Sequence, residues 1–230
     1  LAKLHASLWG SDKISPVNAP WLQTQMDTPV DTDQVRIMWQ WIALNLEEPG
    51  FCSIAPKHYL DDPRKVERAF DRLGEIERAY DAPHCIALGD CHQGNTYILP
   101  EGERLWLDWQ LVRRGRPWRD LTYFVIGALT VEERRKHHKD LVKQYRDYLV
   151  ATGVAGVPTF EEAWEQTRLW VMYGLQAWVG HDVAPAGRHV GRVALRRAAV
   201  DPPGNGLDLL LAEPQVVLEV LDPDVAVVAI

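Results

Sequence analysis

Three polar residues of the sequence could together carry out phosphoryl transfer. Asp90 and Asn95 lie five residues apart in one polar segment, and Asp108 follows Asn95 by 13 residues. A carboxylate and an amide oxygen are ligands that Mg²⁺ accepts when phosphate oxygens and water fill its other positions. Asn95 and Asp108 therefore predict a magnesium site. Asp90 is placed to act as a base or as an orienting acceptor towards a nucleophile.

Short β-prone runs surround these polar residues. They cover residues 85–88, 96–99 and 104–107, with Gly, Asp, Asn and Pro between them. If the second and third runs form a hairpin, the end of the later strand returns beside the start of the earlier one. Asn95 and Asp108 then become neighbours. We therefore predict three small strands and an active-site loop over residues 88–110.

The rest of the chain carries helical patterns. Apolar residues recur at helical spacing in four segments, residues 1–9, 33–46, 63–80 and 160–178. We expect Asp120 to cap a further helix, and a capping box at Thr130 to open another that ends near Leu149. The predicted fold is mainly α with a small β-hairpin region, and its core takes up most of the Trp residues.

The composition of the chain changes near its C-terminal end. Every Trp, Tyr and Phe lies at or before Trp178, and no Lys follows Lys143. We therefore expect a main domain over residues 1–178 and a divergent or poorly ordered segment over residues 179–230.

Composition and charge disfavour several classes of protein. The 230 residues carry a formal net charge of −7, which disfavours a nucleic-acid partner. The sequence contains no apolar run of about 18 residues that would predict a membrane span, and its first residues lack the long apolar run of a signal peptide. Three cysteines are too few for a disulfide framework, so we expect a cytoplasmic protein. The acidic balance would suit a cationic substrate.

Residues 88–95 (Leu-Gly-Asp-Cys-His-Gln-Gly-Asn) resemble a catalytic loop of the form H-G-D-x-H-x-x-N. This loop belongs to the aminoglycoside phosphotransferase and choline kinase group, which is related to protein kinases. Residues 107–110 (Leu-Asp-Trp-Gln) resemble the D-F-G-equivalent strand end of that group. Residues 1–9 resemble its helix after the hinge, and residues 119–124 its R-D-[LV]-A-Y-F segment. The nearest branch is the ecdysteroid-kinase-like one, and the matches cover residues 1 to about 178.

The resemblance implies a protein-kinase-like C-terminal lobe that transfers the γ-phosphoryl group of ATP or GTP to a hydroxyl of a small molecule. It makes Asp90 the catalytic aspartate and His92 a catalytic-loop residue that shapes the loop. Asn95 and Asp108 become the cofactor-binding residues that hold Mg²⁺. Asp120 would also accept hydrogen bonds from the backbone of the loop.

Two features depart from that group. Leu88 stands where the group has a His that braces the loop, so we expect a less rigid loop. The N-terminal lobe, with its nucleotide-covering loop and phosphate-pairing Lys, is absent, and no P-loop replaces it. Because the sequence begins at Leu1 rather than Met, we expect that lobe in the full-length protein and impaired activity in this chain.

Two other functions stay open from the sequence. One is a non-catalytic, pseudokinase-like binding module, which Leu88 and the missing lobe suggest. The other is a metal-dependent hydrolase that uses Asp90 and Asp108 on a phosphate ester.

The remaining His and Cys residues favour structural roles. The pairs His84-Cys85 and Cys91-His92 fit a zinc site poorly, because neighbours on a strand point to opposite faces. We expect the two cysteines to pack as small apolar residues. His137 and His138 lie between lysines, which predicts a solvated helix face.

Overall fold

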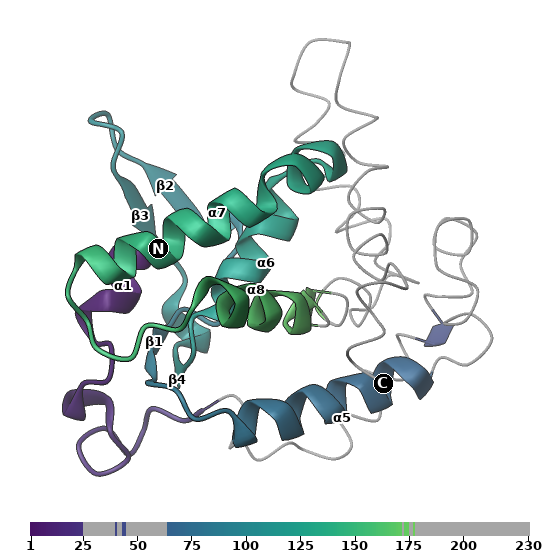
Figure 1. Cartoon of the computed structure of the whole chain (residues 1–230), viewed down its shortest axis with the longest axis horizontal. Helices are drawn as coiled ribbons and strands as arrows, with labels where there is room; N and C mark the ends of the chain where they lie inside the picture. The colour runs from purple at the N-terminus through teal and green to yellow at the C-terminus, as the bar shows by residue number, and fades with distance from the viewer. Residues whose placement is uncertain (25–39, 41–42, 45–63, 172, 175–176, 178–230) are drawn as a thin grey trace. The chain divides into compact units, whose positions relative to one another are not determined.

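The computed structural model describes residues 1–24, 40, 43–44, 64–171, 173–174 and 177 (Figure 1). One unit of the chain comprises residues 1–29, 74–129 and 133–170 and contains the predicted loop. A second unit comprises residues 30–73, 130–132 and 171–230. The predicted helix over residues 33–46 is largely outside the described residues, and the segment 179–230 is wholly outside them. The division at residue 178 stays a prediction.

The described part of the chain is mainly α-helical with a small antiparallel β region, as predicted. Two pairs of short strands make up this region. β1 (Cys85–Ala87) pairs with β4 (Arg113–Gly115), and β2 (Thr96–Ile98) pairs with β3 (Arg104–Trp106). The three predicted strands are confirmed as β1, β2 and β3. The prediction missed β4, because it consists of two arginines and a glycine and carries no β-prone pattern. β4 forms because it hydrogen-bonds to β1 on one side and meets Thr24 in an isolated bridge.

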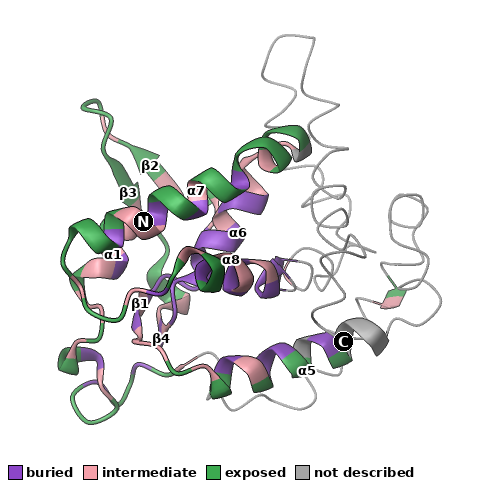
Figure 2. Ribbon diagram, in the orientation of Figure 1, coloured by how far each residue is buried: buried purple, intermediate pink, exposed green. Residues whose placement is uncertain are grey.

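The hairpin of β2 and β3 is confirmed. Thr96 lies opposite Trp106, and the turn closes with a hydrogen bond of 2.8 Å from the Leu99 amide to the Glu103 carbonyl. Gly102 in this turn has a φ of +85°, which a residue with a side chain rarely adopts. Both faces of the hairpin are largely exposed, and in Figure 2 it extends away from the buried helices.

The N-terminal segment packs beside β1. α1 (Ala2–Ser7) contacts β1, and its residue His5 is buried. A short 3-10 helix, η1 (Asp12–Ile14), follows and is capped by the Ser11 hydroxyl. Ile14 then forms a small apolar cluster with Ala19 and Leu22. The chain therefore returns along the β1–β4 pair before it leaves the described residues.

α6 (Trp118–Ala128) is the most buried helix of this unit. It packs against α8 (Phe160–Leu169), where the Thr122 hydroxyl donates to the Thr167 carbonyl at 3.1 Å. Asp120 was expected at the N-cap of this helix, and that prediction was wrong. Pro117 occupies the N-cap and Asp120 lies in the first turn. A proline already has a φ suited to a helix start, so the helix begins before Asp120.

α7 (Val131–Ala151) presents one buried face, formed by residues at spacings of four, three and four: His138, Val142, Tyr145 and Leu149. The prediction of a solvated face holds for His137 and is wrong for His138, whose residue is only 5% exposed. The lysines beside His138 indicated solvent, but the helical spacing to Val142 places it on the buried face.

The remaining helices follow the sequence closely. α5 (Arg64–Ala79) lies within the predicted range of 63–80. α8 begins with a capping box in which Thr159 and Glu162 satisfy each other's backbone amides. α8 ends at Leu169 and Trp170 forms a turn, but the described residues 171, 173, 174 and 177 are again helical, so the predicted helical segment to residue 178 is interrupted only by this turn among the described residues. None of the helices among the described residues is long and apolar enough to cross a membrane.

Candidate functional site

The predicted catalytic loop begins directly after β1 and is anchored by its backbone. The Leu88 and Gly89 amides donate to the two carboxylate oxygens of Asp120 at 2.6 and 3.1 Å. Gly89 has a φ of +84°, and a Cβ at this position would collide with the carbonyl oxygen of Leu111. The loop therefore requires glycine here. The expectation that Asp120 accepts hydrogen bonds from the loop backbone is confirmed.

A buried chain of polar groups supports Asp120 from behind. Nε2 of His5 lies 3.3 Å from the Asp120 carboxylate, and Nδ1 lies 2.6 Å from the Tyr145 hydroxyl. Burial raises the pKa of Tyr145 well above its ordinary value, so its hydroxyl keeps the proton. The hydroxyl can then donate to Nδ1 while the N–H at Nε2 donates to Asp120. α1, α6 and α7 each supply one of these three side chains.

The sequence analysis did not find His5 or Tyr145. Their signal was present, since His5 lies on the apolar stripe of residues 1–9 and Tyr145 on the buried face of α7. A polar ring in an apolar stripe needs a partner when it is buried. No spacing rule, however, joins two residues that are 140 positions apart.

Leu88 fills the position where the resemblance expects a bracing histidine. Its residue is 1% exposed, so its side chain is part of the core. The expectation of a less rigid loop overlooked the backbone, because Asp120 and His5 fasten the loop at this point without any contribution from the side chain of residue 88.

Asp90 is partly buried and lies in contact with two residues of its own loop. Its Oδ2 accepts a hydrogen bond from the Asn95 amide at 3.3 Å and lies 3.7 Å from Nε2 of His92. The contact with His92 is the main reason why the pKa of Asp90 is lowered, although burial opposes the shift. Asn95 and Arg119 also lower this pKa. The carboxylate is therefore ionised at neutral pH.

His92 is oriented by a glycine two residues further on. Nδ1 of His92 accepts a hydrogen bond from the Gly94 amide at 3.1 Å, so a neutral ring carries its proton on Nε2. That proton faces Asp90, and the edge of the ring contacts Tyr123 with centroids 6.1 Å apart. This geometry fits the loop-shaping role that the resemblance implies.

Asn95 ends the short 3-10 helix η2 (Gln93–Asn95). Its amide nitrogen donates to the backbone carbonyl of Asp90 at 3.0 Å and to the Asp90 carboxylate at 3.3 Å. Both partners are acceptors only, so the orientation of the amide is fixed. The Asn95 side-chain oxygen is then the atom that can accept a ligand.

Asp108 lies beside Asn95 at the open end of the hairpin. The Leu107 amide donates to the Asn95 carbonyl at 2.8 Å, which makes Asp108 and Asn95 neighbours as predicted. Asp108 has a φ of +55°, the single positive value among the described residues other than glycine. Such a conformation is strained and often marks a functional position. The Asp108 carboxylate is exposed and accepts a hydrogen bond from the Gln110 side-chain amide at 3.4 Å.

The Asn95 and Asp108 oxygens fit a magnesium ion that keeps most of its positions for phosphate oxygens and water. They do not fit a closed metal cage. No group of three or more His, Cys, Asp and Glu side chains among the described residues could hold a metal ion.

The cysteines near the loop are structural. Cys85 and Cys91 are free and buried, and burial raises the pKa of both thiols. The expectation that they pack as small apolar residues is confirmed.

A protein-family model described as "Uncharacterized oxidoreductase dhs-27" matches residues 87–166. This span starts at the end of β1 and ends within α8, so it includes Asp90, Asn95, Asp108 and Asp120. No curated protein matches the chain, and no solved structure matches it.

Proposed function

We propose that this chain is the C-terminal lobe of a protein-kinase-like small-molecule phosphotransferase, in the cytoplasm, that moves the γ-phosphoryl group of ATP or GTP to a substrate hydroxyl. The observation that carries the proposal is the fixed Asn95 amide. Asp90 holds the nitrogen of this amide, which leaves its oxygen to accept a ligand where the hairpin brings Leu107, the neighbour of Asp108, against Asn95. One loop thus joins an ionised carboxylate to a pair of magnesium ligands, as phosphoryl transfer requires.

Some residues of the loop would orient the acceptor hydroxyl, and others would hold the ion that offsets the charge of the phosphates. Asp90 would accept a hydrogen bond from the attacking hydroxyl and orient it, since its lowered pKa makes it a weak base. His92 would keep Asp90 in place. Mg²⁺ held by Asn95 and Asp108 would offset the charge of the phosphates. Because Gly89 packs against Leu111, the segments that carry Asp90 and Asp108 are held close together.

The word "oxidoreductase" in the description of the matching family does not guide this proposal. A dinucleotide-binding fold of the common type needs the motif G-x-G-x-x-G after a strand. The sequence contains no such motif. We therefore rest the proposal on the loop geometry and on the resemblance of residues 88–95 and 107–110.

The test is a search for phosphorylated product. The chain, alone and extended upstream of Leu1, is incubated with Mg²⁺, ATP or GTP and a panel of small hydroxyl compounds, and products are detected by mass spectrometry. We expect Asp90→Asn and Asp108→Asn to lower turnover by about 10²-fold or more. Asp140→Asn changes an exposed carboxylate on α7 and serves as the matched control, with unchanged turnover.

Three outcomes distinguish the functions that the sequence leaves open. Nucleotide binding without any phosphorylated product would favour the pseudokinase-like module. Mg²⁺-stimulated release of phosphate from an ester, without nucleotide, would favour the hydrolase. Phosphotransfer that is unchanged in Asp108→Asn would contradict the assignment of the magnesium ligand.

A further inference from the structure

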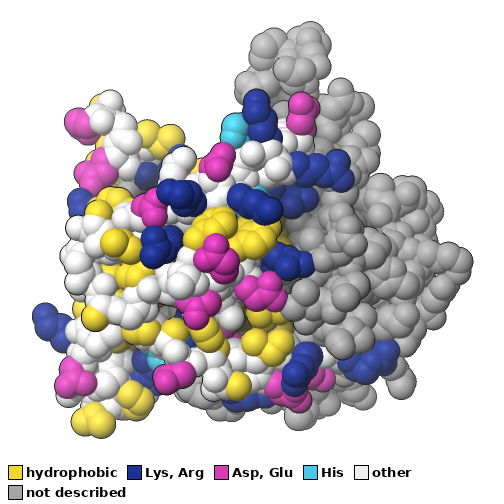
Figure 3. Space-filling view, viewed as in Figure 1, with side chains coloured by type: hydrophobic (Ala, Val, Ile, Leu, Met, Phe, Trp, Pro, Cys, Tyr) yellow, Lys and Arg dark blue, Asp and Glu magenta, His cyan; other side chains and the backbone are white. Residues whose placement is uncertain are grey.

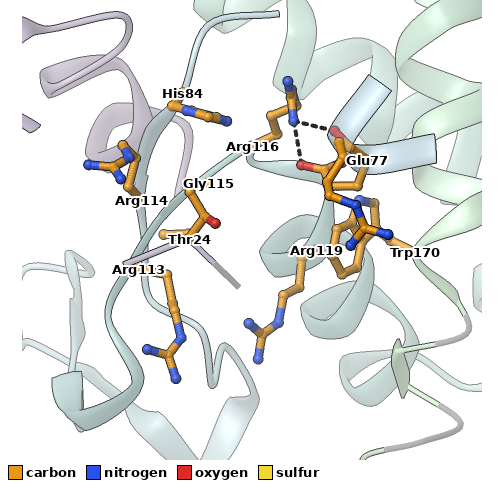
Figure 4. A pocket seen from close by; sticks show the side chains of 11 residues that line it. Thr24, Glu77, His84, Arg113, Arg114, Gly115, Arg116, Arg119 and Trp170 are labelled. Atoms are coloured by element: carbon orange, nitrogen blue, oxygen red, sulfur yellow. Dashed lines mark hydrogen bonds and ion pairs between the residues drawn. The ribbon is translucent and has the colours of Figure 1, made fainter. Parts of the chain in front are cut away.

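A pocket of about 200 Å³ lies beside β4 and is lined mainly by arginines (Figure 4). β4, the start of α6 and the end of α5 supply its charged side chains. The charged residues that line it are Glu77, Arg78, Arg113, Arg114, Arg116 and Arg119. The described lining therefore holds five guanidinium groups and one carboxylate.

The one carboxylate is already matched by one arginine. Nη1 of Arg116 lies 2.7 Å from Oε1 of Glu77, and both groups are buried. Arg116 also donates to the backbone carbonyls of Glu77 and Tyr80. Burial raises the pKa of Glu77, and the Arg116 charge and hydrogen bond oppose this shift. Glu77 therefore does not offset the charge of the other four arginines.

Two of the arginines, Arg113 and Arg119, lie on one side of the pocket. Figure 4 shows both side chains extending to the same side of the pocket, away from the Arg116–Glu77 pair. Arg114 instead donates to the Ile14 carbonyl at 2.8 Å, which fixes its side chain but leaves its charge. A planar guanidinium can form two parallel hydrogen bonds with a carboxylate or a phosphate.

This concentration of positive charge opposes the overall charge of the protein. The chain has a net charge of −7, and the face shown in Figure 3 mixes acidic and basic side chains. A concave site lined by one sign of charge focuses its field and raises the local concentration of the opposite ion. The volume is below the 300–1,000 Å³ or so of pockets for drug-sized ligands, so a small anionic group fits best.

The pocket adjoins the catalytic loop. Ala87 lines it and lies three residues before Asp90. Arg119 lines it as well, and its charge contributes to the lowered pKa of Asp90. A molecule held at this arginine would therefore be near the carboxylate that orients the acceptor.

We propose that this pocket binds the phosphate or carboxylate group of a small molecule. If the proposed function holds, this molecule is the hydroxyl acceptor, which is then anionic. The overall charge of the protein led us to expect a cationic acceptor. We now propose an anionic one, because the positive charge of the pocket acts on a bound molecule more strongly than the net charge of the whole chain.

Direct binding tests the pocket without any phosphotransfer. Inorganic phosphate and, separately, acetate are titrated calorimetrically into the chain in the absence of nucleotide and Mg²⁺. We expect Arg113→Gln to weaken binding of the preferred anion by about tenfold. Arg78→Gln, which changes an exposed side chain of α5, should weaken it by a smaller factor. Arg135→Gln removes the same charge from the exposed face of α7 and should leave the affinity unchanged.

The outcomes separate this inference from the proposed function. Tighter binding of phosphate assigns a phosphate site, and tighter binding of acetate assigns a carboxylate site. If neither anion binds, the assignment of the pocket as an anion site is wrong. It is also wrong if Arg113→Gln and Arg135→Gln have the same thermal stability and bind the anion with equal affinity. Where an acceptor is phosphorylated, Arg113→Gln should raise KM for the anionic acceptor and not for its neutral ester. Arginine-dependent anion binding without any phosphotransfer would refute the proposed function and leave the anion site standing.

Discussion

Two buried histidines of this unit, His5 and His138, differ in what surrounds them. His5 has a partner at each ring nitrogen, Tyr145 at one and Asp120 at the other. His138 packs edge-on against Trp164, with centroids 5.1 Å apart. Among the described residues, its Nε2 has no hydrogen-bond partner. The His5 imidazole is therefore part of a hydrogen-bond network in which both nitrogens have partners. Burial of the His138 imidazole instead costs free energy of folding.

This difference follows the position of the two rings relative to the catalytic loop. The network of His5 ends on the amides of Leu88 and Gly89, so each of its bonds helps to fix the loop. His138 supports only the packing of α7 against Trp164. Burial lowers the pKa of His138 to about 4, with Arg134 adding to the shift. The comparison indicates that the hydrogen bonds of His5 hold the loop backbone in place, whereas His138 contributes through packing.

The strongest test of this comparison removes the centre of the network. Asp120→Ala leaves two loop amides and the N–H of His5 without an acceptor in a buried region. We expect a loss of about 3–5 kcal/mol in the free energy of unfolding. Urea unfolding measures this loss. Asp108→Asn is the control, since it changes an exposed aspartate and should cost no more than about 0.5 kcal/mol. Similar losses in both variants would show that Asp120 has no special structural role.

The second prediction concerns His138 and pH. The pKa of His138 is about 4 in the folded chain, below its ordinary value of 6.5. The unfolded chain therefore binds the proton first as the pH falls, and stability declines from pH 6.5 towards pH 4. The shift predicts a loss of roughly 2 kcal/mol between pH 7.5 and pH 5.

Urea unfolding at several pH values measures this loss. His138→Leu should remove this part of the pH dependence, whereas His137→Gln, on the exposed side of the same helix, should keep it. Parallel pH profiles for wild type and His138→Leu would contradict the assignment.

The third prediction concerns a variant in which His5, like His138, has a buried ring nitrogen without a hydrogen-bond partner. Tyr145→Phe removes the hydroxyl that lies 2.6 Å from Nδ1 of His5 and leaves that nitrogen buried without a donor. We expect a loss of about 1.5 kcal/mol in the free energy of unfolding. Tyr148→Phe removes an exposed hydroxyl from the same helix and should have almost no effect. If the two variants unfold at the same urea concentration, the contact between Tyr145 and His5 adds nothing to stability.

Local patterns predicted most of the elements that surround the site. The hairpin followed from the alternation of β-prone runs and turn residues, and it placed Asn95 beside Asp108 correctly. Helical spacing located α5 and α7. These features depend on neighbours within a few residues, so a single sequence contains the information.

The support behind the loop could not be predicted in the same way. β4 has no apolar pattern, and it is a strand only because β1 lies beside it. The contacts of His5 with Asp120 and with Tyr145 join segments more than 100 residues apart. The basic pocket likewise gathers arginines from α5, β4 and α6, which are ordinary surface residues when they are read one at a time. Tertiary contacts, rather than local propensity, determine these features.

The contact between Gly89 and the Leu111 carbonyl has a consequence for how the site could change. The absent side chain at residue 89 sets the distance between the strand that leads to Asp90 and the segment that follows Asp108. Any larger residue would push these two segments apart and separate Asp90 from Asp108. A substitution of Gly89 would therefore increase the distance between the loop that carries Asp90 and the segment that carries Asp108. It would leave the side chains of both segments unchanged.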